Sequence, residues 1–536
     1  MKTLKISYII GLLIGLLITP ACTDLEEEIL DEFTEEIVTS DPNLLPSLIA
    51  PSLAQIRRLW LREDVWGIQE TTTDECFYPT RGTDWYDGGV WQEQYLHTWD
   101  PMHRDIIATW NTLSAGISRS NTSIFNLGIP QSDDEKYIKE YRAQAVFLRA
   151  FFEYYLLDIY GIVPVRDPYN TDFSIQAEIK NRKQGFNLII NELTDILDDI
   201  ILRKNAEYGV PTKDAALMLL AKMYLNKGVY TGTENYDSCL IYLNEIINSG
   251  NYALADDYFD MFGVENQERY KNPDDEGILV AVLDDGDNYD LDDRIQWVKT
   301  TFHYSQDLGG NFTSNWNGAS ATQGYLEEAW FAGTDTATDV RWQDDRFFSS
   351  MAVMLGFNIG QQYNIDKSAD TLIPLETRGG DPLIFTAECP LDDALENEGV
   401  RVLKYPPRID PINTSRTPND YIIWRYADAL LMKAECLARQ GSVSDALTIV
   451  NEIRTKRNAP TINATTQEDM LDKILIERGL ELYWEGHRRQ DLIRFGKFLE
   501  PKSNKDNTSP ETALLCPIPQ DAIDGSDGKI QQNPGY

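Results

Sequence analysis

Two pairs of amphipathic helices constrain the fold of this chain more than any other feature. Residues 211–227 and 237–248 form one expected pair, and residues 426–439 and 444–457 form the other. Apolar residues recur at helical spacing in each segment, and small alanines stand where the two helices of a pair would cross. A helix, a short turn and a second helix with this pattern are typical of tetratricopeptide-like repeats. The pairs do not align at a fixed period, so the sequence predicts helix pairs rather than a regular array.

Further helices are expected on the N-terminal side of these pairs. The clearest spans residues 135–160, where Phe151 and Tyr155 share one face and Gly161 marks the end. Other helical patterns cover residues 45–61, 104–127 and 185–202. The chain is therefore predicted to be mainly α, with helix pairs that form a scaffold.

Residues 252–419 have a different character. They are dense in Gly, Asp, Asn and Thr, and no helix longer than a few turns is evident. A long stretch of this kind inside a compact domain is usually a functional insertion. We expect one domain over residues 41–536. Its helical scaffold would lie mainly in 41–250 and 420–500, and the insertion would form a large, loop-rich ligand-binding face.

The start of the chain has the features of an exported lipoprotein. Two early lysines precede an uncharged apolar run, and a small residue then precedes Cys22. The run indicates a secretory signal, because it is short for a membrane span. The cysteine at the cut site resembles a bacterial lipoprotein signal, which implies a signal peptide over residues 1–21 and a palmitate-type lipid anchor on Cys22. The acidic segment 22–40 resembles the surface-export tether of Bacteroidetes lipoproteins. The expected location is therefore the cell surface, on the outer membrane. A disordered linker is the alternative reading of this segment.

The composition excludes some classes of ligand. The net charge of −38 argues against nucleic acid, because phosphates require Lys and Arg. It also makes a polyanion a poor ligand, so a neutral ligand fits best. If Cys22 is acylated, five widely spaced cysteines remain without a C-x-x-C motif, which predicts neither a disulfide framework nor a zinc site.

The stretch Phe77–Trp99 points to a ligand. It combines seven aromatic residues with glycines and a proline that interrupt regular structure. Planar rings beside polar donors are what a sugar-binding surface requires, since sugar C–H faces stack on rings and hydroxyls take directed hydrogen bonds. For any single ring, packing in the core is the preferred reading, whereas the group as a whole indicates a ligand surface. Trp99 and Trp110 are interpreted as packing residues, whereas Trp91 and Tyr95 are left open.

Three stretches carry a specific resemblance. They are residues 141–165, residues 420–458 and residues 476–497, the last reading IERGLELYWEGHRRQDLIRFGK. The motifs CPIP at 516–519 and QNPGY at 532–536 follow in order. Together they closely resemble the RagB/SusD family of Bacteroidetes surface lipoproteins. The resemblance implies a non-catalytic lipoprotein that captures oligosaccharide or polysaccharide. It also implies a partner, a SusC-like TonB-dependent transporter, which this subunit caps as a lid.

The diagnostic charges of these motifs are expected to serve the fold. They recur at helical spacing and could form an internal ion-pair network with Arg425, Asp428 and Glu435. The charged residues in question are Glu477, Arg478, Glu481, Glu485, Arg488, Asp491 and Arg494.

Candidate ligand residues are chosen by their chemistry, because sugar contacts in this family vary with the glycan. Trp85 follows Arg81 and Asp84 in a glycine-punctuated loop, and Trp316 lies between two amides. Arg378 precedes two glycines that would let a ligand approach the backbone. The full set is Trp85, Trp316, Arg378, Tyr405, Asp41, Asn43, Arg81 and Asp84. Tyr405 would be presented by the two prolines after it, whereas Asp41 and Asn43 are either polar contacts or an N-cap. The pattern looks like a branch that includes fructan binders.

Two other functions stay open. The 86 acidic residues could by chance supply the two carboxylates of a glycoside hydrolase, but no H-E-x-x-H, G-x-S-x-G or P-loop motif is present. The third reading is a tetratricopeptide-type scaffold that binds only protein.

No cofactor is expected. Asp284, Asp287 and Asp290 could ligate calcium. A solvated acidic turn is the preferred reading, because the spacing and the glutamate of an EF-hand are missing.

Overall fold

The structure is a computed structural model that describes residues 43–130, 135–170, 172, 174–282, 297–308, 315–407 and 419–536. Contacts between residues divide the chain into the units Met1–Leu44 and Leu45–Tyr536. Only residues 43 and 44 of the first unit are described. The signal peptide, Cys22, the acidic tether and Asp41 lie outside the described residues, as do Asp284, Asp287 and Asp290.

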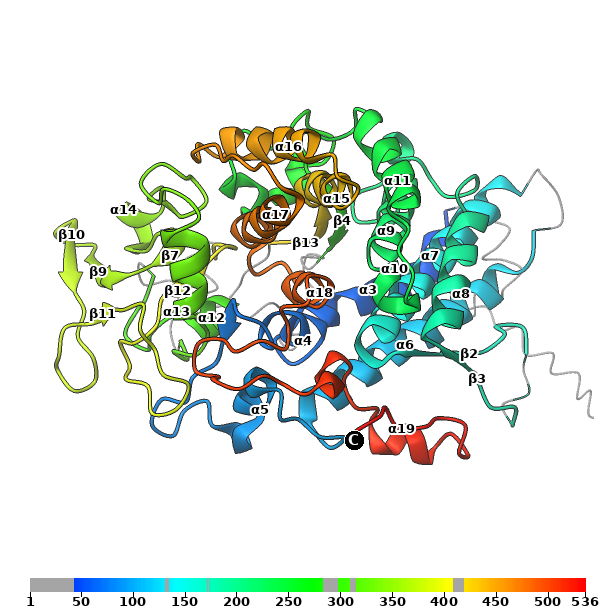
Figure 1. Ribbon diagram of the computed structural model, residues 1–536, viewed down its shortest axis with the longest axis horizontal. Coiled ribbons are helices and arrows are strands. Elements are labelled where there is room, and N and C mark those ends of the chain that lie inside the picture. Colours follow the sequence, from blue (N-terminus) through cyan, green and yellow to red (C-terminus); the bar gives the residue numbers. More distant parts are fainter. Residues whose placement is uncertain are drawn as a thin grey trace, which may run out of the picture. The chain divides into compact units, whose positions relative to one another are not determined.

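The unit Leu45–Tyr536 is built on a helical scaffold (Figure 1). Its longer helices are α3 (Leu45–Ile56), α6 (Arg104–Leu127), α7 (Lys136–Tyr160), α8 (Arg182–Asp195), α9 (Lys213–Leu225), α11 (Tyr236–Asn248), α15 (Tyr426–Arg439), α16 (Val443–Lys456) and α17 (Gln467–Leu482). Helices α9 and α11 pack as one pair and α15 and α16 as the other, and α11 also packs on α15. This arrangement confirms the mainly α, tetratricopeptide-like fold.

Shorter helices connect these elements. They are α4 (Val65–Glu70), α5 (Val90–Leu96), α10 (Lys227–Thr231), α12 (Trp297–Thr301), α13 (Gln323–Tyr325), α14 (Phe348–Met351), α18 (Arg488–Arg494) and α19 (Gln520–Asp524). Two expected helices have other bounds. The helix predicted over 185–202 is α8, which begins three residues earlier because Asn181 and Gln184 form a capping box, and which ends at Asp195. The helix predicted over 45–61 is α3, which ends at Ile56 and is followed by a 3-10 helix over Arg57–Trp60.

The loop-rich insertion contains most of the short strands. Strand β7 (Leu355–Asn358) lies between β6 (Gln343–Asp344) and β12 (Arg401–Leu403), and all three are antiparallel. The remaining strands pair two by two: β1 (Cys76–Phe77) with β5 (Ser320–Ala321), β2 (Ile162–Val165) with β3 (Glu178–Asn181), β4 (Gly277–Ala281) with β13 (Tyr421–Arg425), β8 (Gly360–Gln361) with β11 (Ile384–Phe385), and β9 (Tyr363–Asp366) with β10 (Thr371–Pro374). In Figure 1 the strands β7 and β9 to β12 of this region, green to yellow, lie on the opposite side of α17 from α6–α9, whereas β4 lies near α9.

A buried ion-pair network joins the insertion to the scaffold. Arg425 contacts Glu481 at 2.7 Å and Glu485 at 2.8 Å. Arg478 contacts Asp428 at 2.9 Å, and the network also includes Asp491, Glu435 and Arg494. These contacts confirm the structural role predicted for the charged motifs. Arg488 is an exception, because it reaches Asp74 at 2.7 Å instead of the helical carboxylates.

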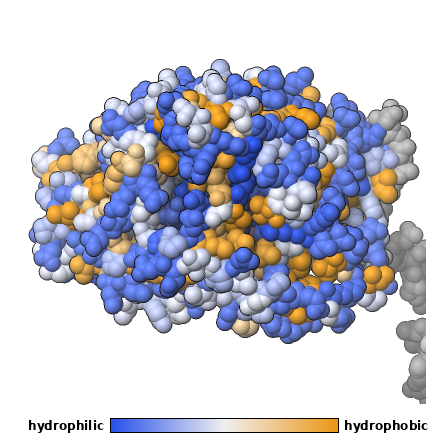
Figure 2. Space-filling view, in the orientation of Figure 1, coloured by the Kyte–Doolittle hydropathy of each residue, from blue (hydrophilic) through white to orange (hydrophobic). Residues whose placement is uncertain are grey.

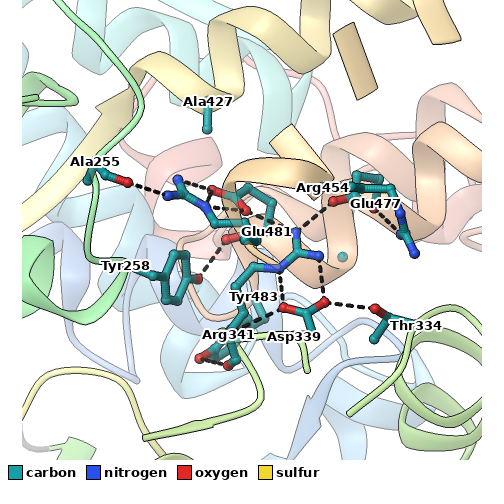
Figure 3. Close-up of polar contacts among 12 residues, drawn as sticks. Ala255, Tyr258, Thr334, Asp339, Arg341, Ala427, Arg454, Glu477, Glu481 and Tyr483 are labelled. Atoms are coloured by element: carbon teal, nitrogen blue, oxygen red, sulfur yellow. Dashed lines mark hydrogen bonds and ion pairs between the residues drawn. The ribbon is translucent and has the colours of Figure 1, made fainter. Parts of the chain in front are cut away.

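The network also includes residues of the insertion, which the sequence did not identify as partners. Arg341 contacts Glu477 at 2.6 Å and Glu481 at 2.9 Å, and Asp339 fixes the other edge of its guanidinium (Figure 3). Burial alone would raise the pKa of Glu481, but the arginines around it outweigh burial and hold that pKa well below its usual value. The network therefore ties α17 to the insertion through charges that must all remain paired.

One face of this unit is predominantly polar. On the face shown in Figure 2, hydrophilic residues prevail and apolar residues form small groups. Among the described residues, no helix is long and apolar enough to cross a membrane.

Candidate functional site

A tight turn places the first candidate residues. The backbones of Arg81 and Asp84 hydrogen-bond to each other in both directions, each at 3.0 Å. Gly82 takes a φ of 62°, which an L-residue rarely adopts. Asp84 emerges from the turn with 39% of its side chain exposed. Arg81 points inward instead and is 2% exposed.

Trp85 is held in a strained and closely packed position. Its φ is 62°, a conformation that costs a non-glycine residue about 1–3 kcal/mol and that clusters at ligand sites. Its ring packs 4.8 Å from the ring of Tyr78 and 5.7 Å from that of Trp91. A Cβ on Gly318 would lie 2.3 Å from this ring, so only glycine fits there. Trp85 is 9% exposed, so little of its ring is available to a ligand.

Trp316 is the more accessible of the two tryptophans. It accepts a hydrogen bond from Trp85 Nε1 at its carbonyl oxygen, at 2.7 Å, and the two ring centroids are 6.3 Å apart. Its ring is half-buried. The Arg62 guanidinium lies 5.2 Å and the Lys299 ammonium 4.7 Å from its centroid, both within the range of cation–π attraction.

Arg378 completes this surface from the insertion. Its side chain is 60% exposed, and its Nη2 lies 3.6 Å from Asp84 Oδ2. The guanidinium stacks on Tyr304 at 4.3 Å from the ring centroid, and the Tyr304 hydroxyl donates a hydrogen bond to Asp84. Three separate segments of the chain therefore converge on one acceptor and one donor.

Glu396 fixes Arg378 from behind. It accepts hydrogen bonds from the backbone N–H of Arg378, at 2.8 Å, and from its Nε. It also contacts His303 Nε2 at 3.2 Å. The backbone N–H of Ser305 donates to His303 Nδ1, so the ring proton lies on Nε2 and donates to Glu396. Burial lowers the pKa of His303 to about 4, and the imidazole is neutral at pH 7.

Two buried arginines hold the loop that carries Glu396. Arg401 donates to the carbonyl oxygens of Glu398 and Gly399, at 2.9 and 2.6 Å, and Arg81 donates to that of Leu395. Both guanidiniums also donate to Ser320 Oγ. Their pKa values are lowered by burial, and no carboxylate of a described residue forms an ion pair with either. They act as hydrogen-bond donors that shape the site.

The predicted site residues thus have different outcomes. Trp85, Trp316, Arg378 and Asp84 are brought together, although their contact with a ligand stays a prediction. Arg81 lies beneath them as a support, which corrects its assignment as a ligand contact. Asn43 is exposed but belongs to the unit Met1–Leu44.

The expected presentation of Tyr405 at the surface is wrong. The side chain is 2% exposed, its ring lies 5.1 Å from that of Phe262, and its hydroxyl accepts a hydrogen bond from the Ile422 backbone. The rigid prolines that follow it fix the backbone but do not determine which way the ring faces.

The four aromatic residues that were interpreted as packing residues or left open are buried. Trp99 and Trp110 are core residues, as predicted, and Trp91 and Tyr95 join them. Tyr86 differs, because it is 58% exposed beside Trp85.

The sequence patterns did not identify four residues of this surface: Tyr304, Glu396, Arg62 and Lys299. Tyr304 had a usable signal, since it is an aromatic residue of the insertion like Trp316. The other three are ordinary charged residues whose sequence neighbours give no sign of their partners. Among the described residues, no group of three or more His, Cys, Asp or Glu side chains could hold a metal ion.

The fold and the site define a helical scaffold that presents a loop-borne surface of rings and charged groups, and comparisons with known proteins agree. The SusD family profile matches residues 392–536, and a second profile, described as starch-binding associating with outer membrane, matches residues 59–225. The starch-binding protein SusD of Bacteroides thetaiotaomicron is 26% identical over 87% of this chain and 84% of its own. A SusD-like protein of Formosa agariphila is 25% identical over the whole of both chains.

Solved structures share the fold. A SusD superfamily protein of Parabacteroides distasonis superposes with a TM-score of 0.72 at 17% identity, over 94% of this chain and 100% of that one. Surface glycan-binding protein A of Bacteroides thetaiotaomicron, in complex with laminarihexaose, gives 0.66 at 19% identity, over 92% and 99%. The two family profiles and the curated relatives therefore support a protein of the SusD/RagB family.

Proposed function

We propose that this protein is a glycan-binding lipoprotein of the cell surface that captures a neutral oligosaccharide or polysaccharide without cleaving it. The observation that carries this proposal is the convergence of Trp316, Asp84 and Arg378 from separate loops of the insertion and the first aromatic stretch. A partly exposed ring and directed polar groups near it suit a sugar. The names of the relatives, which bind starch or laminarihexaose, support the same class of ligand.

The proposed lipid anchor on Cys22 would hold the protein at the outer membrane. A SusC-like TonB-dependent transporter would then receive the glycan. Support for this part comes from the family resemblance and from the profile described as associating with outer membrane.

The alternative of a hydrolase is less well supported by the site. A glycoside hydrolase needs one protonated carboxyl group as general acid. Burial raises the pKa of Glu396, but hydrogen bonds from Arg378 and His303 outweigh burial, and the net pKa is below the usual value. The Glu396 carboxylate therefore stays ionised, and it accepts hydrogen bonds from Arg378 and His303.

Affinity electrophoresis tests the proposal. The purified protein would be run through gels that contain amylose, levan, inulin or laminarin, and the reducing ends released from each glycan would be measured. We expect retardation by at least one neutral glycan and no release of reducing ends. Release of sugar would overturn the non-catalytic role. The absence of retardation on every glycan, together with binding of a purified transporter, would favour the pure protein scaffold.

A further inference from the structure

Asp84 and Arg378 lie side by side, but neither takes up all of the hydrogen-bonding capacity of the other. The distance of 3.6 Å between Oδ2 and Nη2 exceeds that of an ordinary hydrogen bond. Among the described residues, only Tyr304 hydrogen-bonds to the Asp84 carboxylate, and Glu396 engages Arg378 only through its Nε and backbone N–H. Asp84 Oδ1 and both Nη groups of Arg378 therefore keep hydrogen-bonding capacity, and their side chains are 39% and 60% exposed.

Both groups are held in place from below. The Tyr304 ring supports the guanidinium at 4.3 Å while its hydroxyl restrains Asp84, so one side chain sets the spacing of the pair. Glu396 fixes the opposite edge of the guanidinium and is itself bound by His303. A side chain as long and exposed as Arg378 would otherwise lose considerable rotamer entropy when it bound a ligand.

We propose that Tyr304 and Glu396 are positioning residues. They hold Asp84 and Arg378 so that the pair hydrogen-bonds to two adjacent hydroxyl groups on one sugar. The inference rests on the proposed capture of a glycan and deepens it. One hydroxyl donates to Asp84, and its neighbour accepts from Arg378. Hydrogen bonds with a charged partner are the stronger kind, so this pair contributes selectivity as well as affinity.

The pair defines a class of ligand. Glucans joined through the fourth carbon, such as amylose, keep two adjacent free hydroxyls on each internal sugar, and so do the fructans levan and inulin. The internal sugars of laminarin, which are joined through the third carbon, have none. The site should therefore select amylose or a fructan over laminarin.

The test uses whichever of amylose, levan and inulin retards the wild type in the gel. The affinity of the wild type and of its variants for that glycan is measured. Tyr304→Phe keeps the supporting ring but removes the hydroxyl, and it should weaken binding about tenfold. Tyr169→Phe is the matched control, because Tyr169 also donates its hydroxyl from a half-buried position, to Gly128 O at 3.1 Å. The control should bind as the wild type does, and the thermal unfolding of both variants shows whether the fold is intact.

A double-mutant cycle separates positioning from a merely structural role. In an Arg378→Ala background, Tyr304→Phe should cost much less than it does alone, because little remains of the pair to position. Equal losses in both backgrounds would overturn the positioning role. Glu396→Gln should likewise weaken binding, whereas Asp274→Asn, which alters a comparable ion pair with Arg269, should not.

Selectivity gives the second readout. The affinity for laminarin should be at least about tenfold lower than the affinity for the glycan that retards the wild type. The Tyr304→Phe variant should show a smaller difference between these two affinities. Laminarin bound as tightly as amylose or fructan would refute the reading of adjacent hydroxyls while leaving glycan capture in place. If no neutral glycan binds at all, the proposed function itself fails.

Discussion

Replacement of Gly318 by alanine tests the packing of Trp85 without touching a ligand. The added Cβ would lie 2.3 Å from two atoms of the Trp85 ring and 2.7 Å from the carbonyl oxygen of Thr300, whereas ordinary contacts begin near 3.4 Å. The ring has little room to retreat, because Tyr78 and Trp91 pack against it. The clash must therefore displace the ring or the backbone by about 1 Å.

The expected cost follows from these contacts. Overpacking of a well-filled site destabilises by about 1–3 kcal/mol, and loss of the hydrogen bond from Trp85 Nε1 to Trp316 O adds about 1 kcal/mol. We expect Gly318→Ala to lower the free energy of unfolding by about 2–4 kcal/mol and to weaken glycan binding as well. Chemical denaturation and calorimetric titration would measure the two effects.

Gly228→Ala is the matched control. Gly228 is helical, and its added Cβ would meet only the flexible side chain of Glu234, at 3.1 Å. Alanine is also the better helix former, so this change should be neutral or slightly stabilising. If Gly318→Ala left both stability and glycan affinity unchanged, the account of a tightly seated Trp85 beside the ligand would be refuted.

Three further predictions concern the ring, the core charges and pH. Trp316→Ala should lose about 1–3 kcal/mol of glycan binding in calorimetric titration with little change in stability, and unaltered affinity would remove Trp316 from the site. Glu481→Gln should destabilise by about 3–5 kcal/mol in denaturant unfolding, because three arginines lose a buried partner, and a loss below about 1 kcal/mol would contradict the network. Burial raises the pKa of Glu75 to about 7, so its contribution is complete below about pH 4.5 and is lost as pH rises through 7. The melting temperature should fall over this interval in the wild type and fall less in Glu75→Gln, and parallel pH profiles would contradict this assignment.

At acidic pH, stability should depend on a different group, Glu435. Burial would raise the pKa of Glu435, but Arg494 and Arg439 outweigh it and lower the pKa to about 2. A lowered pKa means that the stabilisation, about 3 kcal/mol, is present above pH 4.5 and is lost as pH falls towards 2. Glu435→Gln should therefore flatten the acid limb of the stability profile in thermal unfolding, and an unchanged acid limb would argue against this pairing.

The helices were predictable from the sequence because their signals are local. Periodicity located α7, α9, α11, α15 and α16 to within a few residues of their ends. The predicted end of α8 at residue 202 was wrong, because the apolar pattern continues past Asp195 although the helix does not. The buried charges of α17 were assigned correctly as structural. Their partner Arg341 could not be inferred, because a contact between segments far apart in the chain leaves no periodic trace.

The candidate site was only partly predictable. Chemistry and loop context selected Trp316, Asp84 and Arg378, which the structure brings to one surface. The same reasoning selected Tyr405, whose ring is buried. Residue type and neighbouring prolines describe what a side chain can do, but its exposure depends on the packing of distant segments. Tyr304 shows the converse, since nothing in its immediate sequence places it between Asp84 and Arg378.

The most direct test of the central claim is a calorimetric titration with the neutral glycan that retards the wild type in a gel. The wild type is compared with a Trp316→Ala/Arg378→Ala variant. We expect saturable binding by the wild type and an affinity at least about a hundredfold lower in the variant, with both proteins folded to the same degree. A variant that bound the glycan as tightly as the wild type would contradict the claim that this surface is where the sugar is captured.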